Sequence, residues 1–98
     1  MPVTVLFDML FKPESAEAGL KATSAAVKDT RAFEGNTGVS VLVDEADPAH
    51  VVIVEHWASA SHDEAYQAWR AGSGAPTEII ALLARPPRTL HFTVALNL

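Results

Sequence analysis

Residues 51–58 read VVIVEHWA, and this stretch decides the fold of the chain. Its apolar side chains recur with the period of two that is typical of a β-strand. One face of the expected strand carries Val51, Ile53, Glu55 and Trp57. The opposite face is also apolar, apart from His56. Because a strand that is apolar on both faces has to be covered on both, we expect a layer on each side of its sheet.

The residues before this stretch supply its hairpin partner. Residues 37–44 alternate in the same way, with Val39, Val41 and Val43 on one face against Ser40, Leu42 and Asp44 on the other. Between the two stretches, residues 45–50 contain Asp47-Pro48, a pair that is typical of turns. Two strands joined by so short a polar segment predict an antiparallel hairpin.

A strand and a helix come before the hairpin. Residues 3–11, VTVLFDMLF, alternate with a period of two and are largely apolar on both faces. Pro13 suits the first turn of a helix, and Ser15 could instead be its N-cap. We expect this helix to run to about Phe33, where Gly35-Asn36 ends it. Mostly small side chains that let a helix lie close to a sheet form one stripe: Ala16, Leu20, Thr23, Val27 and Thr30.

A second helical region and a last strand follow the hairpin. Ser59 or Ser61 caps the expected helix, and residues 72–74, Gly-Ser-Gly, end it. Residues 77–85 predict a short helical piece, which Pro86-Pro87 ends because proline disfavours helix in the residue before it. Residues 89–96 alternate again and predict the final strand.

The element order β-α-β-β-α-β predicts an α+β, ferredoxin-like fold in which residues 1–98 form one domain. We expect a four-stranded antiparallel sheet with its helices on one face, since two helices cover only one face of such a sheet. The other face is apolar as well, and a second copy of the same sheet would hide it. The pattern therefore predicts a homodimer of the dimeric α/β-barrel kind.

Composition narrows the classes of function. The chain has 98 residues, 49% of them hydrophobic, with a net charge of −5 and no cysteine. An acidic surface without a basic cluster argues against nucleic acid as a partner. Without cysteine there are no disulfides, thiol nucleophiles or zinc–thiolate sites. No apolar run reaches the length of a membrane span, so we expect no membrane association and a cytoplasmic location.

Three further features resemble the antibiotic biosynthesis monooxygenase family. The first is the helix end at residues 30–36, TRAFEGN, and the second is Glu55-His56-Trp57, which is similar to the Glu-x-Trp of the family at the end of the third strand. The third is the short acidic helix at residues 61–70. The resemblance implies a homodimer with its sheets packed face to face and a pocket between sheet and helices in each subunit. It also implies oxidation of quinol or polyketide substrates by molecular oxygen without a cofactor.

The sequence departs from the haem-degrading relatives. These proteins use a histidine nine residues after the tryptophan as an iron ligand, and they need an asparagine on the first strand. Here Tyr66 stands at the first position, and the first strand offers Asp8 but no asparagine. No histidines and carboxylates have convincing metal-ligand spacing. We therefore expect no haem, no metal and no other cofactor.

The candidate catalytic residues are Trp57, His62 and Tyr66. If the face of Trp57 looks toward the helices, its ring can stack on a flat aromatic substrate, and the alternative is a core tryptophan. His62 and Tyr66 lie four residues apart on one helix, so they project from the same face. His62 could act as a base or be a solvated residue of the first turn, and Tyr66 could donate a hydrogen bond to a substrate oxygen.

The candidate substrate-binding residues are Asp8, Ile53, Glu55 and Trp69. A carboxylate beside a buried tryptophan would have a raised pKa, so Glu55 could serve as a base. The more common alternative is an ion pair of Glu55 with Arg31 or Arg70 at the sheet margin. Trp69 could extend the aromatic wall or anchor its helix in the core. Asp8 is an inward-facing candidate that could equally be structural.

Two functions of different class remain open. The first is a cofactor-independent monooxygenase that acts on a small aromatic, quinol or polyketide-like substrate with molecular oxygen. The second is a non-catalytic dimeric α/β-barrel protein that binds a small hydrophobic ligand.

Overall fold

The computed structural model describes residues 1–93, and the expected order of elements is confirmed. The strands are β1 (Val3–Leu10), β2 (Asn36–Asp44), β3 (Asp47–Trp57) and β4 (Arg88–Thr93). The helices are α1 (Ala16–Ala32), α2 (Ala60–Arg70) and α3 (Thr77–Leu82), with a 3-10 turn at Pro13–Ser15 before α1. The part of the expected last strand beyond residue 93 lies outside the described residues.

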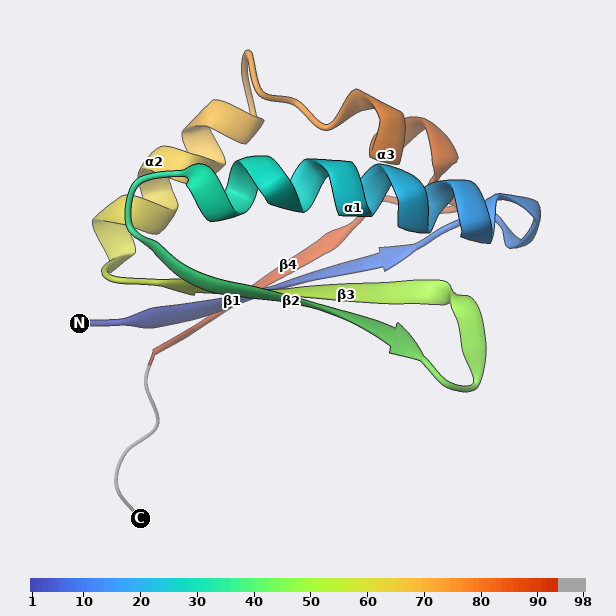
Figure 1. Cartoon of the computed structure of the whole chain (residues 1–98), viewed down its shortest axis with the longest axis horizontal. Coiled ribbons are helices and arrows are strands. Elements are labelled where there is room, and N and C mark those ends of the chain that lie inside the picture. The colour runs from blue at the N-terminus through green and yellow to red at the C-terminus, as the bar shows by residue number, and fades with distance from the viewer. Residues whose placement is uncertain (94–98) are drawn as a thin grey trace.

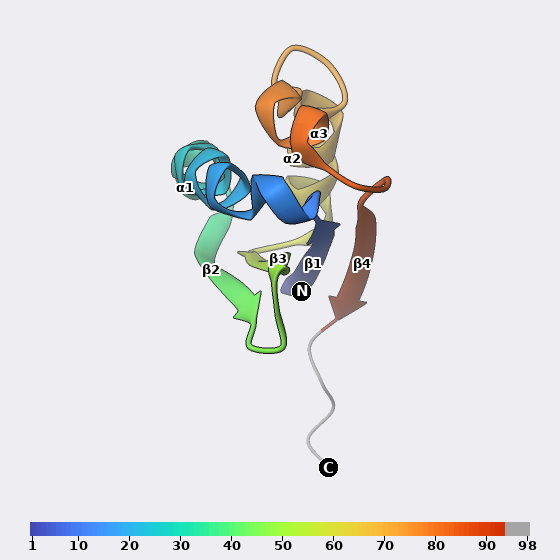
Figure 2. The same cartoon turned by 90° about the vertical axis from the view of Figure 1, so that its right-hand side faces the viewer.

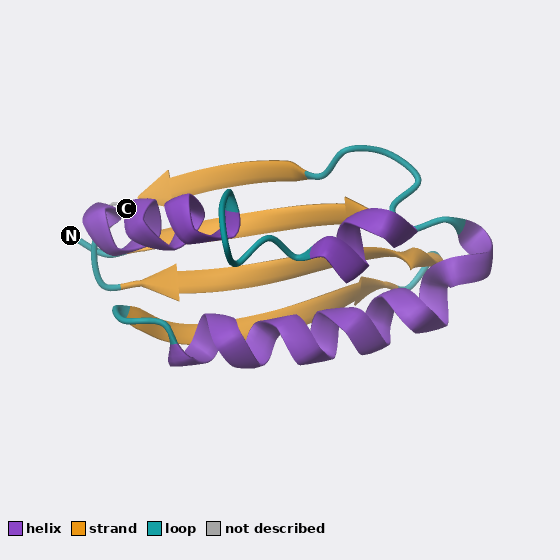
Figure 3. Ribbon diagram, turned by 90° about the horizontal axis from the view of Figure 1, so that it is seen from above, coloured by secondary structure: helices purple, strands orange, loops and turns teal. Residues whose placement is uncertain are grey.

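The four strands form one antiparallel sheet in the order β2-β3-β1-β4. All three helices lie on the same face of this sheet (Figures 1 and 2). Seen from above, α1 runs along the β2 side, and α2 and α3 follow one another over the other half (Figure 3). The ferredoxin-like α+β fold is therefore confirmed, and within one chain the sheet is not closed into a barrel.

The strand register divides the side chains of the sheet between two faces. Glu55 of β3 is paired with Val5 of β1 and Val39 of β2, and Val5 is paired in turn with His91 of β4. These four residues form one row across the helix-covered face, which we call the inner face. Because side chains alternate along each strand, odd-numbered residues point to the inner face and even-numbered residues to the opposite, outer face. This holds from Gly38 to Val43 in β2 and throughout the other three strands.

Helix α1 packs close to the sheet through small residues. Its buried side is formed by Gly19, Ala22, Thr23, Val27 and Thr30. The predicted stripe is therefore right for its last three members, whereas Ala16 and Leu20 are only partly buried. At Gly19 a Cβ atom would come within 2.6 Å of the ring of Phe11, so only glycine allows this approach. Of the two predicted starts the one with Ser15 as N-cap is correct, because Pro13 belongs to the 3-10 turn.

Two element boundaries differ from the prediction. The turn between β2 and β3 contains only Glu45 and Ala46, and β3 begins at Asp47. Carboxylates shorten the turn, since Asp44 accepts a hydrogen bond from the backbone N–H of Ala46 over 2.8 Å and Asp47 accepts one from Ala49 over 3.0 Å. Pro48 then lies at the exposed end of the hairpin, beside an irregularity at Asp44 where strand proline is tolerated.

Helix α3 is three residues shorter than predicted. It ends at Leu82 because the next residues pair with the end of β1 instead of continuing the helix. Leu83 forms a bridge with Phe11, and the backbone N–H of Ala84 donates to the carbonyl of Leu10 over 2.8 Å. This pairing fixes the segment between α3 and β4 over the inner face. No helix in residues 1–93 has both the length and the apolar character that crossing a bilayer requires.

The outer face of the sheet is uncovered and largely apolar. Leu42 and Phe92 are exposed by 54% and 48%, and further half-buried apolar residues on this face are Leu6, Val52, Val54 and Leu90. At one end of the face His50 lies between two carboxylates, with Asp44 at 2.9 Å and Asp8 at 2.7 Å. The hydrogen bonds that these two carboxylates accept raise the pKa of His50 above 6.5, and the bond to Asp44 has the larger effect. Protonated His50 therefore compensates one of the two carboxylate charges of this cluster.

Candidate functional site

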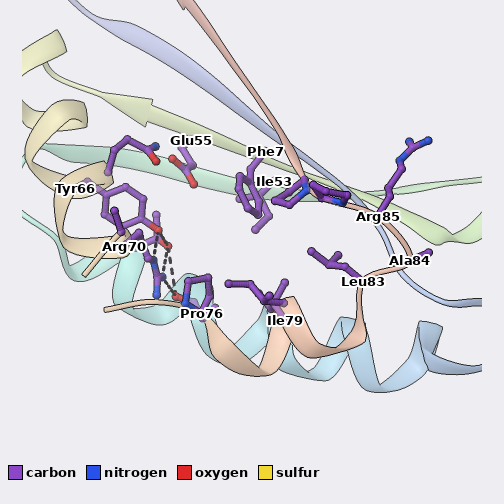
Figure 4. A pocket seen from close by; sticks show the side chains of 17 residues that line it. Phe7, Ile53, Glu55, Tyr66, Arg70, Pro76, Ile79, Leu83, Ala84 and Arg85 are labelled. Atoms are coloured by element: carbon purple, nitrogen blue, oxygen red, sulfur yellow. Dashed lines mark hydrogen bonds between the residues drawn. The ribbon is translucent and has the colours of Figure 1, made fainter. Parts of the chain in front are cut away.

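A cavity of about 620 Å³ lies between the sheet and the helices. We call it the helix-side cavity. Phe7 of β1 and Ile53 of β3 line its sheet wall, and Ile79 of α3 lies opposite them. Polar side chains gather at one end around Glu55 and Tyr66, and the Ala84–Pro87 segment lines the other (Figure 4). The cavity therefore has an apolar body with one polar end.

The polar end is positioned by β3 and α2. Ser59 is the N-cap of helix α2, and its Oγ accepts a hydrogen bond from the backbone N–H of His62 over 3.3 Å. From this start, Tyr66 and Arg70 are one helical turn apart and project from the same side of α2. Gly74 follows the helix and lies so close to the ring of Trp69 that a Cβ atom there would collide with it. A side chain at position 74 would therefore displace the Trp69 ring.

Glu55 is the buried carboxyl of the site. Its side chain lines the cavity while the residue is only 4% exposed, and its Oε1 accepts a hydrogen bond from Nε1 of Trp57 over 3.2 Å. Burial raises the pKa of Glu55 from 4.5 to about 7, in part countered by the hydrogen bond from Trp57. The negative charge of Asp63 raises the pKa further, whereas the positive charges of Arg70 and His91 lower it. A carboxyl with a pKa of about 7 exchanges protons readily near neutral pH.

Tyr66 presents a buried hydroxyl that two neighbours contact. Nε of Arg70 donates to this hydroxyl over 2.7 Å, and Oγ1 of Thr30 lies 2.8 Å from it. Burial raises the pKa of Tyr66 above 10, although the hydrogen bonds with Thr30 and Arg70 oppose the shift. Tyr66 is therefore a neutral phenol at neutral pH and can donate its own proton in a hydrogen bond. Its ring also packs on Trp57, with the centroids 4.7 Å apart.

Arg70 is held entirely by neutral acceptors. Its Nη1 donates to the carbonyl of Gly74 over 3.2 Å, and its Nη2 donates to the carbonyl of Ala26 over 2.9 Å and to Thr30 over 3.2 Å. The guanidinium also lies over the ring of Trp69, 4.6 Å from its centroid. Among the described residues no carboxylate forms a salt bridge with Arg70. Its positive charge is therefore available to an anion that forms in the cavity.

Sequence comparison places this chain in a known family. The sequence profile described as antibiotic biosynthesis monooxygenase matches residues 2–75. The chain belongs to the antibiotic biosynthesis monooxygenase family. The resemblance seen in the sequence is thereby confirmed. A search of curated proteins finds no match.

Solved structures related to this family share its fold. A crystal structure of an antibiotic biosynthesis monooxygenase superposes with a TM-score of 0.82 at 20% identity, covering 95% of this chain and 98% of the other. A candidate antibiotic biosynthesis monooxygenase from Nitrosomonas europaea gives 0.80 at 19% identity, covering 96% and 98%. A protein from Mycobacterium tuberculosis gives 0.80 at 18% identity, covering 97% and 96%. At these identities the likeness is one of fold.

In this antibiotic biosynthesis monooxygenase domain, three of the candidate residues meet at the helix-side cavity. Ile53, Glu55 and Tyr66 all line it. Trp57 shares their face of the sheet but is 0% exposed, and its indole lies behind Glu55 without lining the cavity. The predicted ion pair of Glu55 with Arg31 or Arg70 is wrong. Arg31 is exposed, and Arg70 donates to Tyr66 instead.

The other three candidates lie away from the cavity. Nδ1 of His62 lies 2.7 Å from Oγ of Ser59, and the His62 ring packs against Gly35. Trp69 borders a second, smaller hollow of about 390 Å³. Asp8 is on the outer face of the sheet, so its prediction as an inward residue is wrong. The period of two in β1 places it with Leu6 and Leu10, where it bonds to His50.

Several residues of the helix-side cavity and its surroundings were not singled out from the sequence. Thr30, Gln67 and Arg70 line the cavity, and Asp63 is buried beside it. A signal for Arg70 was present, because it follows Tyr66 by four residues on a helix. Thr30 belonged to the predicted stripe of α1 without a role. In residues 1–93, no three His, Cys, Asp or Glu side chains gather in a way that could hold a metal ion.

Proposed function

We propose that the chain is a cofactor-independent monooxygenase that oxidises a small aromatic, quinol or polyketide-like substrate with molecular oxygen in the helix-side cavity. One observation carries the proposal. A cavity of about 620 Å³ with a largely apolar wall brings a buried carboxyl, Glu55, to the same end as the Tyr66 hydroxyl and the Arg70 charge. Membership in the antibiotic biosynthesis monooxygenase family supports the class of reaction.

The first step is removal of a proton from an electron-rich phenol or enol. Glu55 is the base, since a pKa of about 7 lets it take up a proton at neutral pH. The substrate anion that results is stabilised by a hydrogen bond from Tyr66 and by the charge of Arg70. The apolar wall of Phe7, Ile53 and Ile79 holds the ring and keeps water from the anion.

The second step uses molecular oxygen itself as the oxidant. The substrate anion transfers one electron to oxygen, and the substrate radical and superoxide combine at a ring carbon that carries hydrogen. The peroxide takes the proton back from Glu55, and loss of water with the remaining hydrogen of that carbon leaves a carbonyl. One oxygen atom stays on the substrate and the other leaves as water, so no external reductant is needed.

We further propose that the protein acts as a homodimer in the cytoplasm, with the outer faces of two sheets packed together. The exposed Leu42 and Phe92 lie on this face with half-buried apolar neighbours. In the polar cluster at one end of this face, His50 contacts both carboxylates, so neither Asp8 nor Asp44 would be covered without a hydrogen-bond partner. The helix-side cavity lies on the other side of the sheet and stays open in such a dimer.

Oxygen uptake by metal-free protein tests this function. The substrates are a panel of hydroquinones and anthrones, and the variants are Glu55→Gln and Tyr66→Phe. We expect wild-type uptake to fall by about 100-fold or more in Glu55→Gln, the usual contribution of a general base. Arg31→Gln is the control, because Arg31 is exposed and does not line the cavity.

Each negative result has a clear meaning. No uptake by the wild-type protein with any substrate would favour the binding of a small hydrophobic ligand without catalysis. Uptake that is equal in the wild-type protein and in both cavity variants would show that the reaction occurs elsewhere.

A further inference from the structure

A buried carboxylate, Asp63, joins the helix-side cavity to the edge of the sheet. Asp63 belongs to the first turn of α2 and is buried. Its Oδ2 lies 2.9 Å from Nδ1 of His91, and its Oδ1 accepts a hydrogen bond from the side chain of Gln67 over 3.2 Å. Gln67 lines the cavity beside Glu55. Both oxygens of the Asp63 carboxyl therefore have a side-chain partner.

His91 connects this carboxylate to solvent. It belongs to the edge strand β4, and its side chain is 52% exposed. The strand register places His91 in the same inner-face row as Glu55, with Val5 between them. Glu55, Asp63 and His91 therefore form a series that leads from the polar end of the cavity to the open edge of the sheet.

We propose that Asp63 and His91 are positioning residues for the reaction proposed above, and that their opposite charges set how readily Glu55 takes up a proton. Neither residue lines the cavity, so neither touches the substrate. Only the catalytic consequence of this inference rests on the proposed function. The effect on Glu55 itself is a property of the protein without substrate.

The two charges act on Glu55 in opposite directions. The negative charge of Asp63 disfavours ionisation of Glu55, and the positive charge of protonated His91 favours it. The other charged or titratable groups that act on Glu55 are Tyr66 and Arg70, both from α2. Its neighbours in the row, Val5 and Val39, are apolar. Removing one member of the Asp63–His91 pair therefore leaves the charge of the other uncompensated.

Carbon-13 NMR of the glutamate carboxyl groups measures the effect directly. The titration midpoint of Glu55 is followed in the protein without substrate, with its signal assigned by its loss in Glu55→Gln. In Asp63→Asn, which keeps the shape of the side chain, we expect the midpoint to fall by about half a unit or more. In His91→Gln we expect it to rise, and in His91→Lys, which keeps a positive charge, to return to the wild-type value or below.

The control is His56→Gln, since His56 is exposed on the outer face and should leave the midpoint unchanged. A midpoint that does not move, or that moves the same way in Asp63→Asn and His91→Gln, would overturn the inference.

In a plot of the oxygen-uptake rate against pH, the midpoint on the acid side should shift in the same direction as the Glu55 midpoint in each variant. If the midpoints move as expected but the wild-type protein takes up no oxygen, the charge pair stands and the proposed function fails. If uptake occurs and the midpoints do not move, the proposed function stands and the inference about the pair fails.

Discussion

The indole nitrogen of Trp57 donates a hydrogen bond to Oε1 of Glu55 over 3.2 Å. The tryptophan is fully buried and the carboxyl lines the helix-side cavity, so the one residue holds the other at the cavity wall. Trp57 also packs against Tyr66, which carries the hydroxyl at the same end of the cavity. Trp57 thus contacts two of the three residues to which we assign chemistry, Glu55 and Tyr66, without lining the cavity itself.

Replacing Trp57 by phenylalanine should raise the pKa of Glu55. The hydrogen bond from Trp57 favours the charged carboxylate, so its loss should move the pKa up from about 7, by up to about one unit. Loss of the hydrogen bond and of ring volume should also lower the free energy of unfolding by about 1–3 kcal/mol. NMR titration and urea unfolding measure these two quantities. His56→Gln, on the outer face of the sheet, should leave the Glu55 pKa unchanged, and a fall of that pKa in Trp57→Phe would contradict the assignment.

Glu55 should make the fold less stable as the pH rises. Between pH 4.5 and about 7 the unfolded chain has released this proton while the folded chain still holds it. The folded state then binds more protons, so its free energy of unfolding falls through this window. Glu55→Gln has no ionisable group at this position, so its free energy of unfolding does not show this fall. The stability of the variant relative to wild type should therefore increase by about 2–3 kcal/mol from pH 5 to pH 8. Urea unfolding at both pH values provides the measurement, and equal differences at the two would refute a raised pKa.

A charge on the outer face should prevent dimer formation. Leu42 is 54% exposed on that face, and Leu42→Glu would place a carboxylate in the proposed interface. Sedimentation velocity should show monomers for this variant and dimers for the wild-type protein. Ile80→Glu is a matched control, because Ile80 is 52% exposed but lies on α3, on the other side of the sheet. Dissociation by the Ile80 variant and not by the Leu42 variant would place the interface on the helices.

Gly35 should tolerate no side chain. Its φ of 88° is in the left-handed region that favours glycine, and a Cβ atom there would collide with the ring of His62. We expect Gly35→Ala to lower the free energy of unfolding by about 1–3 kcal/mol. Gly72→Ala is the comparison, since the nearest atom to its Cβ would be 3.6 Å away, and it should change stability by less than about 0.5 kcal/mol. Thermal unfolding of both variants decides between these expectations.

The fold could be predicted because local patterns and tertiary structure agree. Alternation in β1 and β3 assigns each side chain to a face of the sheet. Gly35, with its positive φ, marks the turn between the end of α1 and the start of β2. The hairpin turn was drawn too long because the Asp47-Pro48 pair signals a turn in most contexts. Here the Asp44 and Asp47 side chains bond to the backbone, so two residues suffice.

The site could be predicted only in part. Periodicity places Glu55 and Trp57 on the same face, but it does not tell how deep each lies beneath the helices. Helix α2 covers Trp57, whereas the space over Glu55 and Ile53 stays open. The contact of Arg70 with Ala26 and Thr30 joins residues 44 and 40 positions apart, and no local pattern in the sequence carries such information.

The alternation of the sheet also bears on how such a protein can diverge. Along β1, Val5 and Phe7 face the helices, whereas Leu6 and Asp8 face outward, and the same division runs through the other strands. Substitutions at odd positions can therefore change which ligands the cavity accepts without disturbing the surface on which we expect self-association. Substitutions at even positions can change that surface without altering the cavity. An insertion of one residue within a strand would exchange the two sets at once. Single substitutions thus allow ligand binding and self-association to change separately, whereas a shift of strand register changes both together.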